Sequence, residues 1–237
     1  MSNDSAISLA RPGLIAASDI RAVIQVALQI VIKSWIQICR ERLLAVRHRT
    51  CEPRTAGLLY QRMILVEQAR DPRTPPMKIK CEVATFSGDE LEVPDGRIDI
   101  EIIYSLSDDP DLRLECKRVS TTPGDGPRDR ADYYIGEGVL RFVGDKYGRG
   151  HSWGVMLAFV IDGKSAAAAS FVATSMAAYR KAPLDLCAAW SQEDRFGRSR
   201  HLFRTEHLQG GGPQRISLLH LFLPFPPLSS VRKALSC

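Results

Sequence analysis

Apolar residues recur at helical spacing in the N-terminal quarter of the chain. One stripe with a period of three to four residues runs from about residue 18 to about residue 46 and predicts a long helix. A second helical pattern covers residues 53–68 and ends before Asp71-Pro72. The most apolar stretch, residues 22–38, contains three glutamines and a lysine, so we expect it to fall short of a membrane span and to pack in a core or a dimer.

The period then changes from helical to alternating. Residues 79–83, 98–102 and 112–117 alternate between apolar and polar side chains, which predicts three strands. Within the second run, Ile98, Ile100 and Ile102 are separated by charged residues. Because side chains two apart in a strand share a face, we expect these three isoleucines on one side of the sheet.

The remaining pattern alternates helices with strands. Residues 130–143 and the alanine-rich residues 164–178 predict helices. Residues 153–161 are an almost continuous apolar run, typical of a central buried strand, and residues 215–225 predict a last strand that prolines end. The order of helix, three strands, helix and strand, followed by helix and strand, predicts an α/β fold with a mixed central sheet flanked by helices.

No linker divides the chain, which sets the expected domain organisation. We expect one domain at residues 49–237 and an N-terminal helical extension at residues 1–48 that serves dimerisation. With 237 residues, of which 45% are apolar, the chain can bury a sizeable core and is not disordered. Its six cysteines show neither CxxC nor zinc-finger spacing, so we expect reduced thiols in a cytoplasmic protein without a secretory signal.

Charge is distributed unevenly around a formal net charge of +5. Residues 33–80 and 178–237 are rich in Lys and Arg, whereas residues 81–117 are rich in Asp and Glu. This order suggests an acidic pocket in basic surroundings, with carboxylates for a cation and basic residues for phosphates. An ordinary solvated surface is the alternative interpretation of the same distribution.

The candidate chemistry lies in the second and third alternating runs. Asp99 precedes Glu115 by 16 residues, and Lys117 follows Glu115 by two, so Glu115 and Lys117 share a strand face. If the two strands pair in register, Asp99 joins them. Two neighbouring carboxylates repel each other, and a divalent cation such as Mg²⁺ relieves that repulsion. A lysine beside the cation can orient or deprotonate a water and stabilise charge on a phosphate.

These residues carry a resemblance to a known family. The runs Arg97-Ile98-Asp99-Ile100 and Leu114-Glu115-Cys116-Lys117 are similar to the motif of the PD-(D/E)xK nuclease superfamily, which has the restriction-endonuclease-like fold. The resemblance covers about residues 50–162. It implies that Asp99 and Glu115 hold Mg²⁺, with Mn²⁺ as a substitute, and that Lys117 assists the attacking water. Many members also place a Glu of the preceding helix near the metal, so the resemblance implies Glu52 as a further catalytic and metal-site residue, with Glu67 the weaker candidate.

One position departs from the family pattern. Asp99 follows Ile98 rather than a proline, and a literal Pro94-Asp95 pair lies four residues earlier. We favour Asp99, because Asp95-Gly96 has the composition of a turn whereas Asp99 lies within the alternating run.

The resemblance implies a metal-dependent endonuclease, a hydrolase that cuts nucleic acid, with DNA favoured over RNA. Restriction or antiviral defence, a homodimer and a helper or sensor subunit are the expected biological setting. The alternative is a catalytically silent nuclease-fold subunit that binds nucleic acid or a partner protein. The sequence leaves the choice between these two interpretations to a cleavage assay.

Further candidates lie outside the motif. Arg141 and Lys146, on or just after the helix that follows the motif, are candidate phosphate contacts, with an ordinary helix surface as the alternative. His207 is a candidate for substrate contact, with a structural histidine as the alternative. The run Gly150–Gly154 matches GxSxG, but a turn precedes Ser152 and a strand follows it, so a serine hydrolase is not expected.

Overall fold

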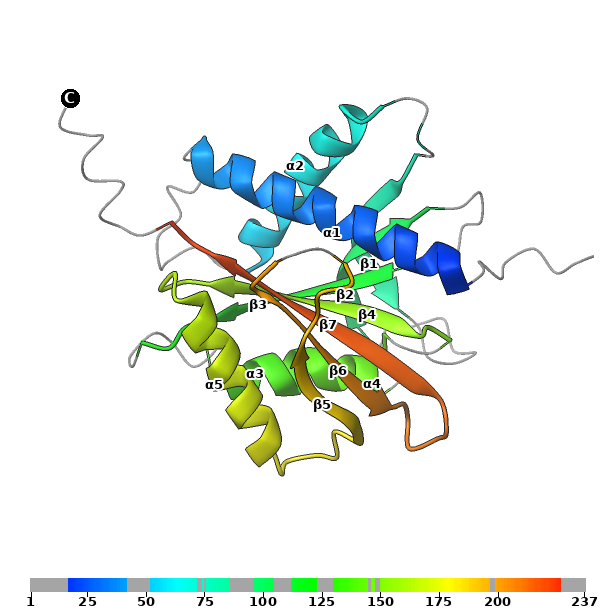
Figure 1. Ribbon diagram of the computed structural model, residues 1–237, viewed down its shortest axis with the longest axis vertical. Coiled ribbons are helices and arrows are strands. Elements are labelled where there is room, and N and C mark those ends of the chain that lie inside the picture. Colours follow the sequence, from blue (N-terminus) through cyan, green and yellow to red (C-terminus); the bar gives the residue numbers. More distant parts are fainter. Residues whose placement is uncertain are drawn as a thin grey trace, which may run out of the picture.

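The computed structural model of the chain describes residues 17–41, 52–71, 74, 76–85, 96–104, 112–122, 130–144, 146–147, 150–196 and 199–226. It is an α/β fold in which a twisted, mixed sheet of seven strands has helices on both faces (Figure 1). The helices are α1 (Ala17–Arg40), α2 (Glu52–Gln68), α3 (Ala131–Tyr134), η2 (Ile135–Val139), α4 (Leu140–Val143) and α5 (Ser165–Ala178). The strands are β1 (Lys78–Thr85), β2 (Gly96–Ile103), β3 (Leu112–Val119), β4 (Trp153–Val160), β5 (Leu186–Gln192), β6 (Leu202–Leu208) and β7 (Arg215–Pro224).

The sheet combines two antiparallel flanks with a parallel centre. Its strand order is β1-β2-β3-β4-β7-β6-β5. Strands β3, β4 and β7 run parallel, whereas the pairs on either side of them are antiparallel. Strand β4 is buried along almost its whole length, as its continuous apolar run predicts, because helices cover both faces of the parallel centre.

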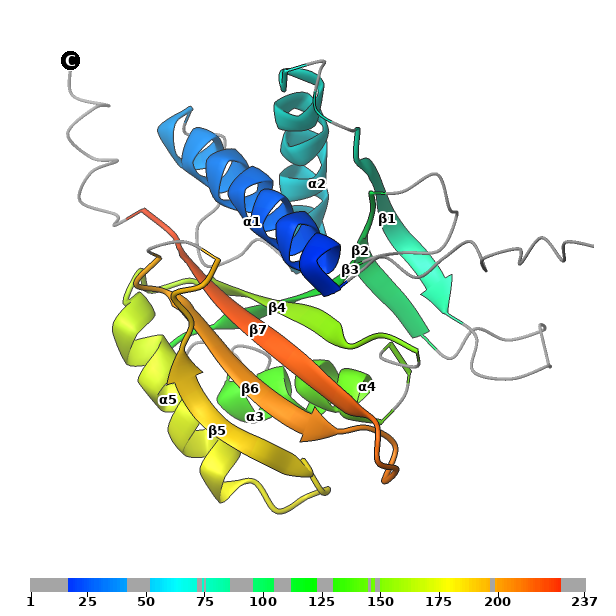
Figure 2. The same ribbon diagram turned by 45° about the vertical axis from the view of Figure 1, so that its right-hand side comes forward.

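Two layers of helices enclose the sheet. Figure 2 shows α1 and α2 on one face and α3, α4 and α5 on the other. Each layer has its own apolar cluster: residues of α1 and α2 pack on alternate residues of β3 and β4, and residues of α3, α4 and α5 pack on the intervening ones. The predicted helix over residues 130–143 is continuous along the chain, but its middle turn, η2, is π-helical.

Helix α1 is part of the main core rather than an appendage to it. Trp35 donates its indole N–H to the carbonyl of Pro224 at 2.9 Å and stacks on Phe159. Trp35 and Ile38 are covered by the chain itself, while Ile36 stays exposed. The expected boundary between residues 48 and 49 lies outside the described residues.

The expectation that α1 falls short of a membrane span was wrong in terms of length and composition. Residues Ile20–Arg40 have a mean hydropathy of 1.6 over their most apolar window, enough to cross a membrane, and within the described residues no other helix meets this criterion. Glutamines lower hydropathy without adding charge, so they do not exclude a span. Half of that window is nevertheless buried inside the fold, as in a core helix.

Strand β2 is irregular next to the predicted site. Ile100 and Ile102 pack in the cluster under α1 and α2, but Ile98 packs in the cluster under α3 and α4. The three isoleucines therefore do not share one face, and the alternation breaks between Ile98 and Ile100. On the neighbouring strand, Glu82 lies between the paired residues Cys81 and Val83 and has a φ of 52°, a strained conformation for a non-glycine residue.

Candidate active site

The two strands that carry the predicted acids are neighbours in the sheet. Strands β2 and β3 pair antiparallel from Ile102 opposite Leu112 to Ile100 opposite Leu114, and Asp99 follows at the point where this pairing ends. The carboxylate of Asp99 accepts a hydrogen bond from the backbone N–H of Cys116 at 2.7 Å. This bond ties Asp99 to the strand that carries Glu115.

Glu115 and Lys117 lie on one face of β3 and touch. The ammonium of Lys117 donates to Glu115 Oε1 at 2.6 Å and to the carbonyl of Cys116 at 2.9 Å. Both side chains are almost fully buried. Their contact is the geometry that two-residue spacing in a strand predicts.

Glu52, the first residue of α2, reaches the same cluster from the helix layer. Its Oε1 accepts from Lys117 Nζ at 3.2 Å, and its Oε2 accepts from the backbone N–H of Arg118 at 3.1 Å. Both carboxylate oxygens of Glu52 thus accept hydrogen bonds from the chain, and one of these bonds holds the ammonium of Lys117. The weaker candidate, Glu67, lies at the other end of α2, where it bonds Arg70 and the N–H of Met77. Asp95 lies outside the described residues.

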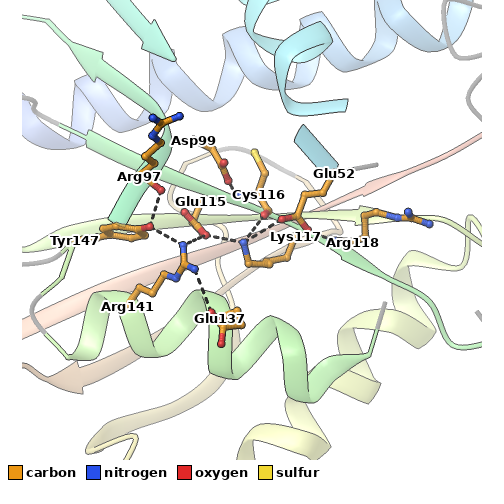
Figure 3. A network of polar contacts seen from close by, with 10 residues as sticks. All are labelled: Glu52, Arg97, Asp99, Glu115, Cys116, Lys117, Arg118, Glu137, Arg141 and Tyr147. Atoms are coloured by element: carbon orange, nitrogen blue, oxygen red, sulfur yellow. Dashed lines mark hydrogen bonds and ion pairs between the residues drawn. The ribbon is translucent and has the colours of Figure 1, made fainter. Parts of the chain in front are cut away.

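Arg141 faces the acids rather than the solvent. Its Nη1 donates to Glu115 Oε1 at 3.2 Å and to the hydroxyl of Tyr147 at 2.6 Å, and its Nη2 donates to Glu137 Oε2 at 3.1 Å (Figure 3). The hydroxyl of Tyr147 in turn donates to the carbonyl of Arg97 at 2.6 Å. Neither Glu137 nor Tyr147 is among the predicted site residues, although the four-residue spacing of Glu137 and Arg141 is that of a helical ion pair.

The other two predicted contacts are not members of this hydrogen-bonded cluster. Lys146 is exposed in the turn after α4. His207 is fully buried, with its Nδ1 at 2.6 Å from the carbonyl of Leu184 and its Nε2 at 2.8 Å from the hydroxyl of Thr205. In this structure the His207 side chain is therefore enclosed in the core, and it offers no donor to a nucleic acid at the surface.

The electrostatics of the cluster are dominated by buried negative charge. Burial raises the pKa of Glu115 to about 8; Lys117 and Arg141 oppose this shift, and Asp99 adds to it. Burial likewise raises the pKa of Asp99. Burial alone would lower the pKa of Lys117, but Glu115, Glu52 and Asp99 outweigh it and keep the ammonium protonated. The cluster thus sets three carboxyl groups, those of Asp99, Glu115 and Glu52, against two cations, and Glu115 keeps its proton up to a pH of about 8.

One atom of this cluster has no partner among the described residues. Glu115 Oε2 is buried and accepts no hydrogen bond there, although a buried carboxylate oxygen without a donor is costly. Within the described residues no group of three or more His, Cys, Asp or Glu side chains is arranged so that it could hold a metal ion, and this includes Asp99, Glu115 and Glu52. Mg²⁺ needs only one or two carboxylates, because it keeps several waters. The Asp99 and Glu115 carboxyl groups, which are close enough to affect each other electrostatically, and the unpartnered Oε2 of Glu115 fit that requirement.

Comparison of the chain with protein-family models, with curated proteins and with solved structures gave no significant match. The interpretation of the cluster thus depends on its own residues and geometry.

Proposed function

We propose that the protein is a metal-dependent phosphodiesterase, an endonuclease of the PD-(D/E)xK type, with DNA as the favoured substrate. The observation that carries this proposal is the buried, unpartnered Oε2 of Glu115 beside Asp99, with Lys117 at 2.6 Å from the other oxygen of Glu115. The order α2, β1 to β3, the helix α3 to α4 and then β4 supports it, because this is the order that the resemblance to the superfamily leads us to expect. A cytoplasmic location, a homodimer and a helper subunit remain part of the proposal.

The residues present divide the work between them. Asp99 and Glu115 would hold Mg²⁺, which when bound supplies a water of lowered pKa and stabilises negative charge on a phosphate. Lys117 stays protonated among its carboxylates, so it serves as a donor that orients water and stabilises developing charge, not as the base. Glu52 holds that ammonium in place from the first turn of α2.

Cleavage by the purified chain tests this function. Plasmid DNA, single-stranded DNA and RNA are incubated with Mg²⁺, with Mn²⁺ or with EDTA. We expect cleavage of DNA only with a metal, and a loss of at least about 100-fold in Asp99→Asn and Glu115→Gln, because each variant removes a charged ligand. The control is Asp132→Asn, which removes an exposed carboxylate on α3.

Two outcomes contradict the proposal. Cleavage that persists in EDTA or in both carboxylate variants would show that the cluster is not the catalytic centre. Tight DNA binding without any cleavage would favour the silent binding subunit instead.

Substitution of Glu52 separates its role from that of a metal ligand. Because both its oxygens are engaged by Lys117 and Arg118, Glu52→Gln should lower the cleavage rate about tenfold and leave Mn²⁺ affinity within about twofold of wild type. Lys117→Ala should behave alike, with a larger loss of rate. Isothermal titration with Mn²⁺ and cleavage rates on the same proteins measure this. A large loss of Mn²⁺ affinity in Glu52→Gln would instead make Glu52 a ligand.

A further inference from the structure

The contacts around Glu115 treat its two carboxylate oxygens differently. Oε1 accepts from Lys117 Nζ at 2.6 Å and from Arg141 Nη1 at 3.2 Å, and Oε2 is the oxygen without a partner in the described part of the chain. Figure 3 shows Glu115 between these two cations. A carboxylate with one oxygen held by two donors cannot exchange its oxygens without breaking both bonds. The direction of Oε2 is therefore set by the cations on Oε1.

Arg141 is itself held in place by two groups. Tyr147 accepts from Nη1 at 2.6 Å, Glu137 accepts from Nη2 at 3.1 Å, and the guanidinium also lies against the Tyr147 ring. The hydroxyl of Tyr147 donates to the carbonyl of Arg97, two residues before Asp99. A chain of hydrogen bonds thus links the backbone of β2 beside Asp99 to the carboxylate of Glu115 on β3.

We propose that Arg141 is a positioning residue that, with Tyr147, fixes the Glu115 carboxylate so that Oε2 is the one oxygen it offers to a divalent cation. This inference rests on the proposed function. A phosphate contact is the competing role for Arg141, but its guanidinium already has three acceptors within the chain, and the side chain is only 29% exposed.

Two substitutions test the position of Arg141 without changing the net charge. Arg141→Lys replaces a planar fork, which reaches Glu115 and Tyr147 together, by a compact ammonium. Tyr147→Phe removes only the hydroxyl and keeps the ring that packs edge-on against Phe142. Because the charge near the cation site is conserved, a change in metal affinity reports orientation rather than Coulombic attraction.

The experiment starts from metal-free protein and measures three quantities: Mn²⁺ affinity by isothermal titration, oligonucleotide affinity in EDTA by fluorescence anisotropy, and cleavage kinetics after Mg²⁺ is added. In both variants we expect Mn²⁺ binding about tenfold weaker and a lower kcat, with KM and oligonucleotide affinity unchanged. Arg62→Lys is the matched control, because it alters the paired contact of Arg62 with Glu41 outside the site and should change none of these values.

The outcomes distinguish this inference from the proposed function. Wild-type Mn²⁺ affinity in both variants overturns the positioning role, and weaker oligonucleotide binding in EDTA with unchanged Mn²⁺ affinity assigns Arg141 to phosphate contact. A wild-type protein that neither binds Mn²⁺ nor cleaves refutes the proposed function itself. Tyr147→Phe keeps the test decisive if Arg141→Lys lowers the melting temperature.

Discussion

Glu115 shows how much of the candidate site a few residues determine. Its spacing from Lys117 and its place in an alternating strand are enough to predict that the two side chains touch, because strand geometry is local. The same spacing says nothing about Arg141, which reaches Glu115 through a helix that crosses over between two parallel strands. The partner that orients the carboxylate is thus a property of the tertiary fold and could not be predicted from the motif.

The raised pKa of Glu115 leads to a prediction about pH. A metal binds the deprotonated carboxylate, and the folded protein holds this proton up to a pH of about 8. Mn²⁺ affinity should therefore rise as the pH increases from 6 to 8, by at most about tenfold per pH unit, and level off above that range. Isothermal titration in buffers of equal ionic strength measures the dependence.

Stability gives an independent reading of the same group. Because the pKa of Glu115 is raised in the folded state, the protonated form of Glu115 favours folding. This contribution to stability is lost as the pH rises from the usual pKa of a glutamate through about 8. Mn²⁺ should restore it, so the increase in melting temperature on adding Mn²⁺ should be larger at pH 8 than at pH 6. A Mn²⁺ affinity and a thermal shift that stay constant over this range would contradict the assignment of Glu115 as a ligand.

At the scale of elements, an aromatic ring of helix α4 packs directly on the backbone of strand β4. Gly154 belongs to the GxSxG match in the sequence, but its role here is steric: a Cβ at this position would lie 2.6 Å and 2.7 Å from ring carbons of Phe142, and 3.0 Å from Leu218. Phe142 directly follows Arg141, so its contact with Gly154 helps to fix the distance between the helix that carries Arg141 and the strand beneath it. The sequence predicts both elements but cannot predict how closely they approach.

Gly154→Ala should therefore lower the free energy of unfolding by about 1–3 kcal/mol, the usual cost of overpacking a core, because the buried Phe142 ring has no room to move. The control is Gly57→Ala in α2, where a Cβ would meet nothing within 4 Å. That change should stabilise the protein by up to about 1 kcal/mol through helix propensity. Urea unfolding of both variants measures the difference, and a neutral Gly154→Ala would show that α4 is loosely seated.

For the whole molecule, the hydrophobic pattern predicts the elements of the sheet better at its centre than at one edge. The continuous apolar run of β4 identifies a strand covered on both faces. Strands β5 and β6 were not predicted, and for β5 the reason is that residues 186–192 are mostly exposed at the sheet edge and carry no clear alternation. The fold class follows from the helices and central strands, whereas the extent of the sheet depends on pairing between distant segments.

The position of α1 tests whether residues 1–48 are a separable extension. Trp35 lies 4% exposed between Phe159 of β4 and Phe225 after β7, so the helix contributes to the same core as the sheet. Trp35→Ala should lower the free energy of unfolding by about 3–5 kcal/mol in a single transition, as expected for a large side chain lost from a core. Ile36→Ala, at the exposed neighbouring position, should change it by less than about 0.5 kcal/mol. An α1 that instead forms a detachable arm or a membrane anchor predicts equal, small effects for both variants, and urea unfolding distinguishes the two arrangements.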